Sequence, residues 1–136
     1  MFPTKRLILI VFIFISSIFQ PVSADAVAEA LSDRMDELLF GGDLEINGAG
    51  IGGQDVLPEI YASRSFEPLW VDDDRIQELL TMLDTAPEHG LDPNDYYVEQ
   101  LRSLIARTQA AGSALDVANL DILLTAALTS DRNCST

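Results

Sequence analysis

The chain of 136 residues contains 22 acidic and eight basic residues, which gives a formal net charge of −14. So negative a chain argues against nucleic-acid binding, because that affinity rests on Lys and Arg side chains that neutralise phosphates. It argues equally against docking on an anionic membrane surface. Cys134 is the single cysteine, so no internal disulfide can form and a packed core must hold the fold together.

Residues 1–24 have the three parts of a secretory signal peptide. Two basic residues precede an apolar run over 7–19, and the segment ends in Val-Ser-Ala, so we expect cleavage between Ala24 and Asp25. An uncleaved anchor is the alternative, but the run is short of the roughly 20 apolar residues that a spanning helix needs. We therefore expect a periplasmic or cell-envelope protein that meets the membrane only transiently, through its signal peptide.

Residues 25–53 are interpreted as an N-terminal arm with a Gly-rich linker. Apolar side chains recur at helical spacing in the first half of this segment. They are Val27, Leu31, Met35, Leu38 and Leu39. Six of the eight glycines lie in residues 41–53, which is typical of a flexible linker. We expect the arm to be loosely attached and dispensable for folding.

Residues 54–131 are expected to form one small helical domain, followed by an irregular tail over 132–136. A short helix with Pro58 in its first turn leads to an extended aromatic connection that ends at Trp70. Asp72-Asp73-Asp74 then supplies capping acids for a helix over about 74–86. Gly90 is the expected left-handed cap that closes this segment.

Asp92 and Pro93 predict the start of the next helix, over about 93–108, as N-cap and first helical residue. Its apolar stripe is predicted to be Tyr97, Leu101, Leu104 and Ile105. After Gly112-Ser113, a last helix over about 114–129 is apolar on most sides, which is typical of a buried helix. No segment alternates convincingly with a period of two residues. The predicted fold class is therefore all-α.

The residue types that usually form catalytic or metal sites do not make up a complete site in this sequence. One histidine and one cysteine cannot build the usual zinc site, and a His89–Cys134 nucleophile pair is disfavoured because Cys134 lies close to an end that should fray. Residues 43–48 match half of a calcium loop, but position 12 is Gln54 and glycines replace the second helix. The acids at 72–74 are a helix cap rather than half of a glycosidase pair. We expect no catalytic residue, no metal and no cofactor.

The last helix and the aromatic connection supply a candidate interaction surface, formed by Leu120, Leu124, Leu128 and Trp70. The helices over 74–86 and 93–108 are too few to cover all sides of residues 120–128, so we expect apolar side chains to stay exposed and to promote association. Trp70 has a second interpretation, because aromatic residues between helices are more often part of the core.

Three motifs occur in order. They are Leu57-Pro58-Glu59-Ile60-Tyr61 with Phe66-Glu67-Pro68-Leu69-Trp70, then residues 88–96 (EHGLDPNDY), then residues 120–128 (LDILLTAAL). Together they resemble the N-terminal scaffold domain of large murein L,D-transpeptidases of bacterial envelopes, from about Asp55 to Asp131. The resemblance implies a helical scaffold that packs against a separate catalytic domain, in which a cysteine nucleophile cross-links peptidoglycan stem peptides.

The chain departs from that family at its tail. Family members carry the nucleophile in a Ser-x-Gly-Cys-x-Arg setting, whereas Cys134 has neither the Ser-x-Gly before it nor the Arg after it. We therefore expect an exported, non-enzymatic scaffold or interaction domain, truncated relative to the family. Its expected partner is an L,D-transpeptidase catalytic domain or another envelope protein. The alternatives are a free-standing peptidoglycan-binding module and a remnant without function.

Overall fold

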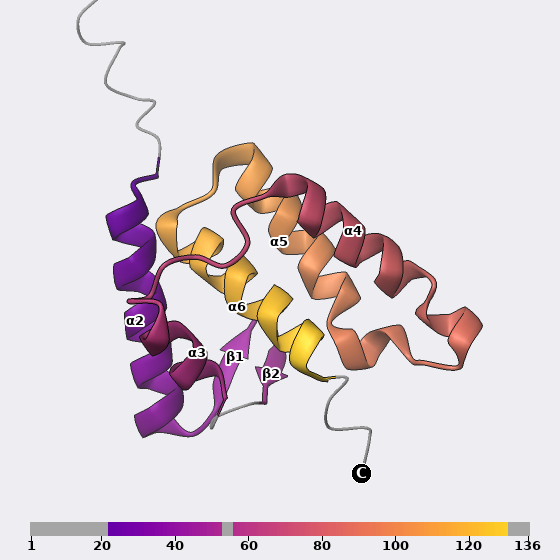
Figure 1. Cartoon of the computed structure of the whole chain (residues 1–136), viewed down its shortest axis with the longest axis horizontal. Coiled ribbons are helices and arrows are strands. Elements are labelled where there is room, and N and C mark those ends of the chain that lie inside the picture. Colours follow the sequence, from indigo (N-terminus) through magenta and orange to yellow (C-terminus); the bar gives the residue numbers. More distant parts are fainter. Residues whose placement is uncertain (1–21, 53–55, 131–136) are drawn as a thin grey trace, which may run out of the picture.

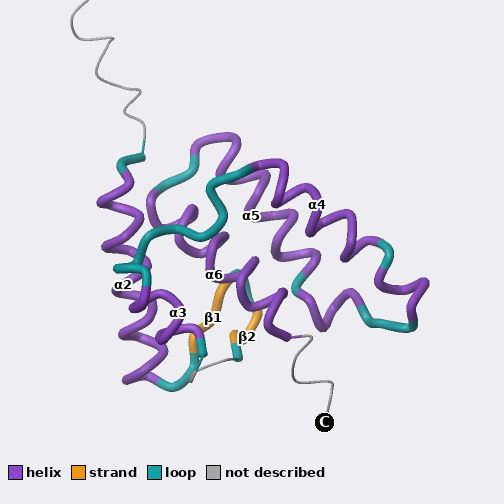
Figure 2. The backbone as a smooth tube through the Cα atoms, viewed as in Figure 1, coloured by secondary structure: helices purple, strands orange, loops and turns teal. Residues whose placement is uncertain are grey.

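The computed structural model describes residues 22–52 and 56–130 (Figure 1). Most of the described chain is helical, with one small antiparallel hairpin (Figure 2), so the predicted all-α class is confirmed. Residues 1–21 of the predicted signal peptide lie outside the described residues. So do Cys134 and the rest of the tail over 132–136. Within 22–52 and 56–130, no helix combines the length and apolar character needed to cross a bilayer.

Helix α2 (Ala24–Gly41) begins where the Ser23 side chain accepts a hydrogen bond of 3.2 Å from the Ala26 N–H. Four of the five apolar residues predicted for this segment form its buried face. They are Val27, Leu31, Met35 and Leu38. Leu39 instead is 56 % exposed. The helical period in the sequence therefore identified the buried face of α2 correctly. It did not show that this face packs in the main core.

Strands β1 (Leu44–Ile46) and β2 (Ala49–Ile51) form the hairpin that follows α2. Asn47 and Gly48 make the two-residue turn, and both have positive φ, 51° and 79°. A type I′ turn needs positive φ at both positions and favours Asn-Gly. Side chains alternate across the strand, so that Leu44 and Ile46 are buried and Glu45 is exposed. The interpretation of residues 43–48 as a polar linker without packed structure is thus wrong.

Helix α3 (Leu57–Ser63) has Pro58 in its first turn, as predicted. After it, Ser65 and Phe66 both adopt left-handed backbone conformations. This turn reverses the chain into the connection that ends at Trp70. Phe66, Leu69 and Trp70 pack partly buried against the core.

Helix α4 (Asp73–Asp84) is capped by Asp72, whose carboxylate accepts a hydrogen bond of 3.0 Å from the Asp74 N–H. The short 3-10 helix η1 (Ala86–His89) follows and ends at Gly90, which is left-handed with φ 78°. The Leu91 N–H reaches back 3.0 Å to the Ala86 carbonyl, which completes the helix-ending arrangement in which glycine is preferred. The predicted caps are confirmed.

A second 3-10 helix, η2 (Pro93–Tyr96), is capped by Asp92, which accepts a hydrogen bond of 2.9 Å from the Asn94 N–H. Helix α5 (Val98–Ala111) is separate from it, because Tyr97 is left-handed with φ 58°. The break changes the predicted apolar stripe. Of these two adjacent tyrosines, Tyr96 is the buried one, at 5 % exposure, and Tyr97 is only partly buried.

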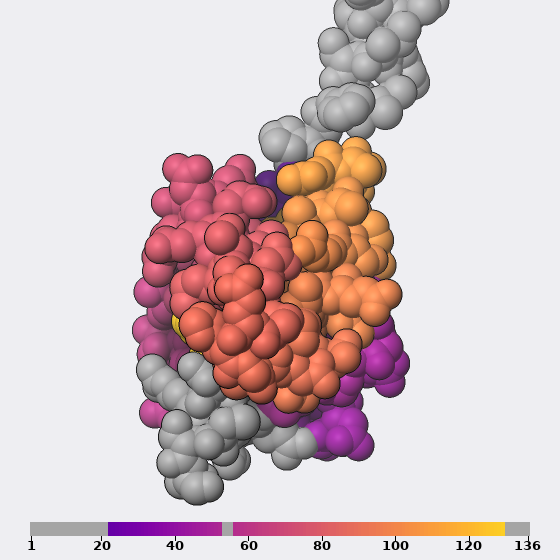
Figure 3. Space-filling view, turned by 90° about the vertical axis from the view of Figure 1, so that its right-hand side faces the viewer, coloured from indigo at the N-terminus to yellow at the C-terminus, as the bar shows by residue number. Residues whose placement is uncertain are grey.

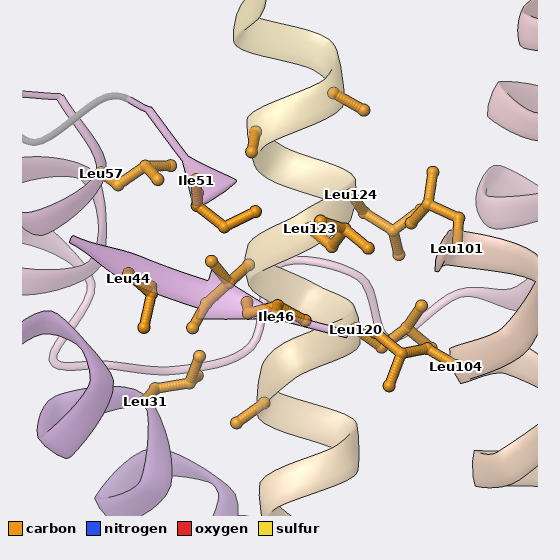
Figure 4. Close-up of a cluster of buried hydrophobic side chains, with 14 of the residues drawn as sticks. Leu31, Leu44, Ile46, Ile51, Leu57, Leu101, Leu104, Leu120, Leu123 and Leu124 are labelled. Carbon is orange, nitrogen blue, oxygen red and sulfur yellow. The ribbon is translucent and has the colours of Figure 1, made fainter. Parts of the chain in front are cut away.

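Helix α6 (Ala114–Ser130) lies at the centre of the fold, between α2, α3 and the hairpin on one side and α4 and α5 on the other (Figure 1). Its most extensive contacts are with α2 and α5. Figure 4 shows the result: Leu31, Leu44 and Ile51 approach α6 from one side, and Leu101 and Leu104 from the other. The all-round apolar character of α6 therefore matches its central position.

The arm expected to be loose is in fact one wall of the core. Leu31 and Leu44 have no exposed surface, and Met35 and Ile46 are each 1 % exposed. A polar contact adds to this packing, because Arg34 Nε donates a hydrogen bond of 2.9 Å to Asn119 Oδ1 on α6. The high glycine content does not make this segment loose, because glycines serve the hairpin and its flanks while the apolar residues between them are buried.

That correction removes most of the expected exposure of α6. Leu124 has no exposed surface and Leu120 is 9 % exposed, whereas Leu128 is 53 % exposed. The prediction that Leu120 and Leu124 form an open surface is therefore wrong. It failed because α2 and the hairpin, set aside as a loose arm, are the elements that cover this helix.

Candidate functional site

Asp121 on α6 is buried, 2 % exposed, and is the centre of a hydrogen-bonded cluster. The Tyr61 hydroxyl on α3 donates to Asp121 Oδ1 over 2.6 Å. The backbone N–H groups of Leu69 and Trp70 donate to the same carboxyl over 3.2 and 2.9 Å. A helix, a connection and the central helix therefore meet at one side chain.

Thr125 lies one helical turn after Asp121 and completes the cluster. Its hydroxyl donates to the Asp121 carbonyl over 2.9 Å and accepts from Trp70 Nε1 over 3.1 Å. It also lies 3.0 Å from the Tyr61 hydroxyl. Among the described residues, no buried side-chain nitrogen or oxygen lacks a hydrogen-bond partner. The cluster is thus fully satisfied, which a buried polar group needs if it is to stabilise the fold.

Burial raises the pKa of the Asp121 carboxyl above its usual range, although the hydrogen bonds from Tyr61, Trp70 and Leu69 act in the opposite direction. Burial also raises the pKa of Tyr61 far above its usual range, and the neighbouring Asp121 adds to this effect. The phenol therefore stays protonated and remains a donor to Asp121. A catalytic acid or base must reach its substrate within hydrogen-bond distance. The polar atoms of this cluster instead form hydrogen bonds with one another and with the backbone.

The members of this cluster are the same residues that carry the sequence motifs. Tyr61 belongs to the first motif, Leu69 and Trp70 to its second half, and Asp121 and Thr125 to the last. The motifs are thus explained by structure, because they fix the connection after α3 to the central helix. Sequence alone gave no sign of the cluster, since Asp121 is one of 22 acids and its partners lie 51 to 60 residues away.

Other polar candidates from the sequence are not brought together. His89 is exposed at the end of η1, and the acids at 72–74 cap α4. The half calcium loop is the hairpin turn. Within the described part of the chain, no three His, Cys, Asp or Glu side chains gather closely enough to hold a metal ion.

A polar hollow of about 420 Å³ lies between the hairpin turn and α5, lined by Asn47, Glu99, Gln100, Ser103 and Arg107. Arg107 is already engaged, because it donates to Asn47 Oδ1 over 3.1 Å and pairs with Asp116. This ion pair lowers the pKa of Asp116. None of the described residues that line the hollow is aromatic.

An apolar opening lies between α4, η1 and the C-terminal end of α6. It is a groove of about 340 Å³ whose lining includes Leu79, Met82, Leu91, Ala127 and Leu128. A smaller hollow of about 140 Å³ shares Leu79, Met82 and Leu128 with it and adds Trp70. Of the four residues in the predicted interaction surface, the structure therefore brings Trp70 and Leu128 together and buries Leu120 and Leu124.

These features define a class of protein, a small helical domain whose motif residues serve its architecture. The Scaffold domain family matches residues 55–130, so the chain belongs to this family. Comparison with curated proteins and with solved structures found no match. The family match begins after the hairpin, so α2, β1 and β2 lie outside it even though they cover α6.

Proposed function

We propose that this protein is an exported, non-catalytic scaffold domain related to peptidoglycan L,D-transpeptidases, which binds a transpeptidase catalytic domain or another envelope protein. Membership of the Scaffold domain family supports an architectural role. The observation that carries the proposal is the convergence of the motif residues on Asp121, because a motif that fixes the fold needs no catalytic function to account for it.

The sequence supports the cell-envelope location through the signal-peptide pattern over 1–24. Cleavage between Ala24 and Asp25 would cut α2 in its first turn and remove Ser23, which caps the helix. N-terminal sequencing of protein from the envelope fraction should therefore begin at Asp25. An intact Met1 on most molecules would contradict export with cleavage.

The partner is tested by mixing the purified protein with an L,D-transpeptidase catalytic domain from the same organism and measuring association by calorimetry. We expect a saturable complex, and no transpeptidase activity from this chain alone on stem peptides. Cys134→Ser should leave both results unchanged. Failure of the catalytic domain to bind would refute the proposed partner, and activity that disappears in Cys134→Ser would refute the non-catalytic role.

A further inference from the structure

Apolar side chains stay in water along the groove between α4 and α6. Met82 is 62 % exposed, Leu128 53 % and Leu91 40 %, and all three line the groove. Each large apolar side chain left in water forgoes the free energy that its burial would contribute. An apolar opening that gathers several of them is typical of an interaction site.

The groove exists because α4 does not pack closely on α6. The main contacts of α4 are with η1 and η2, the two short helices beyond its C-terminal end. Figure 3 faces this end of the molecule, where the segment around residues 85–97 projects toward the viewer with α5 beside it. Leu79 and Leu83 reach the floor of the groove from α4, and Ala127 reaches it from α6.

The segment that forms one side of the groove is rich in acidic residues. Residues 72–96 carry eight carboxylates and one arginine, Arg75. The acids are Asp72, Asp73, Asp74, Glu78, Asp84, Glu88, Asp92 and Asp95. Glu78 and Arg75 both line the smaller hollow, Asp84 is paired with Arg102, and Glu88 adjoins the lining residue His89. Arg75 lies 5.9 Å from the centre of the Trp70 ring, where a cation and an aromatic face attract each other.

We propose that this groove binds an amphipathic helical segment of a partner protein, whose apolar face fills the groove and whose Lys and Arg side chains meet Glu78 and Glu88. A helix laid in an apolar groove is a recurrent mode of recognition, and the acidic surroundings select a basic partner. A second copy of this chain fits poorly, because both copies carry a net charge of −14. Anionic lipid is repelled for the same reason.

This inference rests on the interaction role proposed above but not on the relation to L,D-transpeptidases. The probe is a synthetic helical peptide of about 18 residues, five turns, with Leu on one face and Lys on the other. A second peptide replaces Leu by Ser and keeps the charge, and a third replaces Lys by Glu. Trp70 is the single tryptophan of the chain and lies beside the groove, so its fluorescence reports binding.

The matched variants are Leu128→Glu in the groove and Leu115→Glu at the other end of α6. The two leucines are similarly exposed, 53 % and 48 %, and both substitutions add one negative charge. We expect the Leu/Lys peptide to bind Leu128→Glu at least about tenfold more weakly, a loss of about 1.4 kcal/mol, and to bind Leu115→Glu as it binds the natural protein. The Leu/Ser replacement and the Lys/Glu replacement should each weaken binding by a similar factor or more.

Circular dichroism shows whether each variant keeps its fold, and Met82→Glu replaces Leu128→Glu if the latter unfolds. Equal binding to the groove and control variants would overturn the proposal, as would equal binding of the Ser-faced peptide, which would indicate adsorption by charge alone. A dimer in sedimentation equilibrium that Leu128→Glu abolishes would assign the groove to a second copy. A Trp70 response to phosphatidylcholine vesicles would assign it to a lipid surface. If the catalytic domain fails to bind while the peptide binds as described, the inference stands without the proposed partner.

Discussion

The Tyr61 hydroxyl donates a hydrogen bond of 2.6 Å to the Asp121 carboxyl, across 60 residues of sequence. This bond joins the end of α3 to the central helix inside the core. The same carboxyl accepts the N–H groups of Leu69 and Trp70, so it also fixes the connection between α3 and α4. Loss of the Tyr61 hydroxyl would leave Asp121 Oδ1 with the Leu69 N–H as its remaining hydrogen-bond donor, so a buried carboxyl would be less well satisfied.

Tyr61→Phe should lower the free energy of unfolding by about 1.5–3 kcal/mol, the range for a hydrogen bond to a charged group. The ring still fills its place, so the loss reports the hydroxyl alone. Urea denaturation measures the change. Ser63→Ala is the control, because the Ser63 hydroxyl bonds the Ile60 carbonyl at an exposed position, and it should change stability by less than about 0.5 kcal/mol. Equal effects of the two substitutions would contradict the assigned role of the cluster.

Acidification should affect the natural protein and Asp121→Asn differently. The pKa of Asp121 in the folded protein is raised above its model-peptide value of 3.8, chiefly by burial. A raised carboxyl pKa contributes stability that is fully present below pH 3.8 and is lost as the pH rises through the folded pKa. The stability of the natural protein relative to Asp121→Asn should therefore decline as the pH rises from about 3.5, and level off above the folded pKa.

Asp116 provides the opposite sign for comparison. The hydrogen bond from Arg107 lowers its pKa, so its contribution is present above its unfolded pKa and is lost as the pH falls. The stability of the natural protein relative to Asp116→Asn should therefore decline on acidification. Urea unfolding at intervals of about half a pH unit measures both differences. The same direction for both variants would refute the assignment for Asp121.

Leu31→Ala should lower the free energy of unfolding by about 2–5 kcal/mol, as expected when a fully buried leucine is truncated. Leu31 has no exposed surface and packs in the main core. Phe40→Ala removes a larger side chain from the same helix, but Phe40 is 87 % exposed, so this control should stay within about 0.5 kcal/mol. Limited proteolysis of the natural protein should also spare residues 24–51. Rapid cutting there would restore the interpretation of a loose arm.

Gly48→Ala should destabilise the protein by about 1–2 kcal/mol, because φ at Gly48 is 79° and an alanine is strained in the left-handed region. No atom lies within 4 Å of the added methyl group, so strain rather than a clash would cause the loss. Gly50 on β2 has the same open surroundings without a positive φ. Gly50→Ala should be neutral or slightly stabilising, and thermal denaturation of the pair separates the two cases. Equal losses would mean that the turn is not type I′.

Local signals in the sequence predicted the local structure well. Asp72, Asp92 and Gly90 act within a few residues of their partners, so their positions before and after apolar runs identified three caps. The hairpin carried a local signal too, since Asn47-Gly48 lies between alternating apolar residues, but the abundance of glycine obscured it. A glycine-rich segment can therefore be either a flexible linker or a tight turn between packed strands.

Long-range relationships were beyond the sequence. The periodicity of α2 predicted an apolar face but not the helix on which that face packs. The composition of α6 predicted a buried helix but not the elements that surround it. The break between η2 and α5 depends on the left-handed backbone of Tyr97. Tyrosine, unlike glycine or asparagine, does not signal this conformation in a sequence. The burial of Asp121 depends on three segments that meet only in the folded protein. Such contacts follow from the packing of the whole domain, which a single sequence does not display.

The position of α6 has a consequence for how the protein acquires its structure. Every other described element precedes α6 in the chain, yet α2, α3, α5 and η2 all pack on it. As the polypeptide emerges from the ribosome with its N-terminus first, the described elements before Ala114 have no central helix to pack on. We therefore expect these early segments to remain open until residues 114–130 have emerged, and the domain to close in one late, cooperative step.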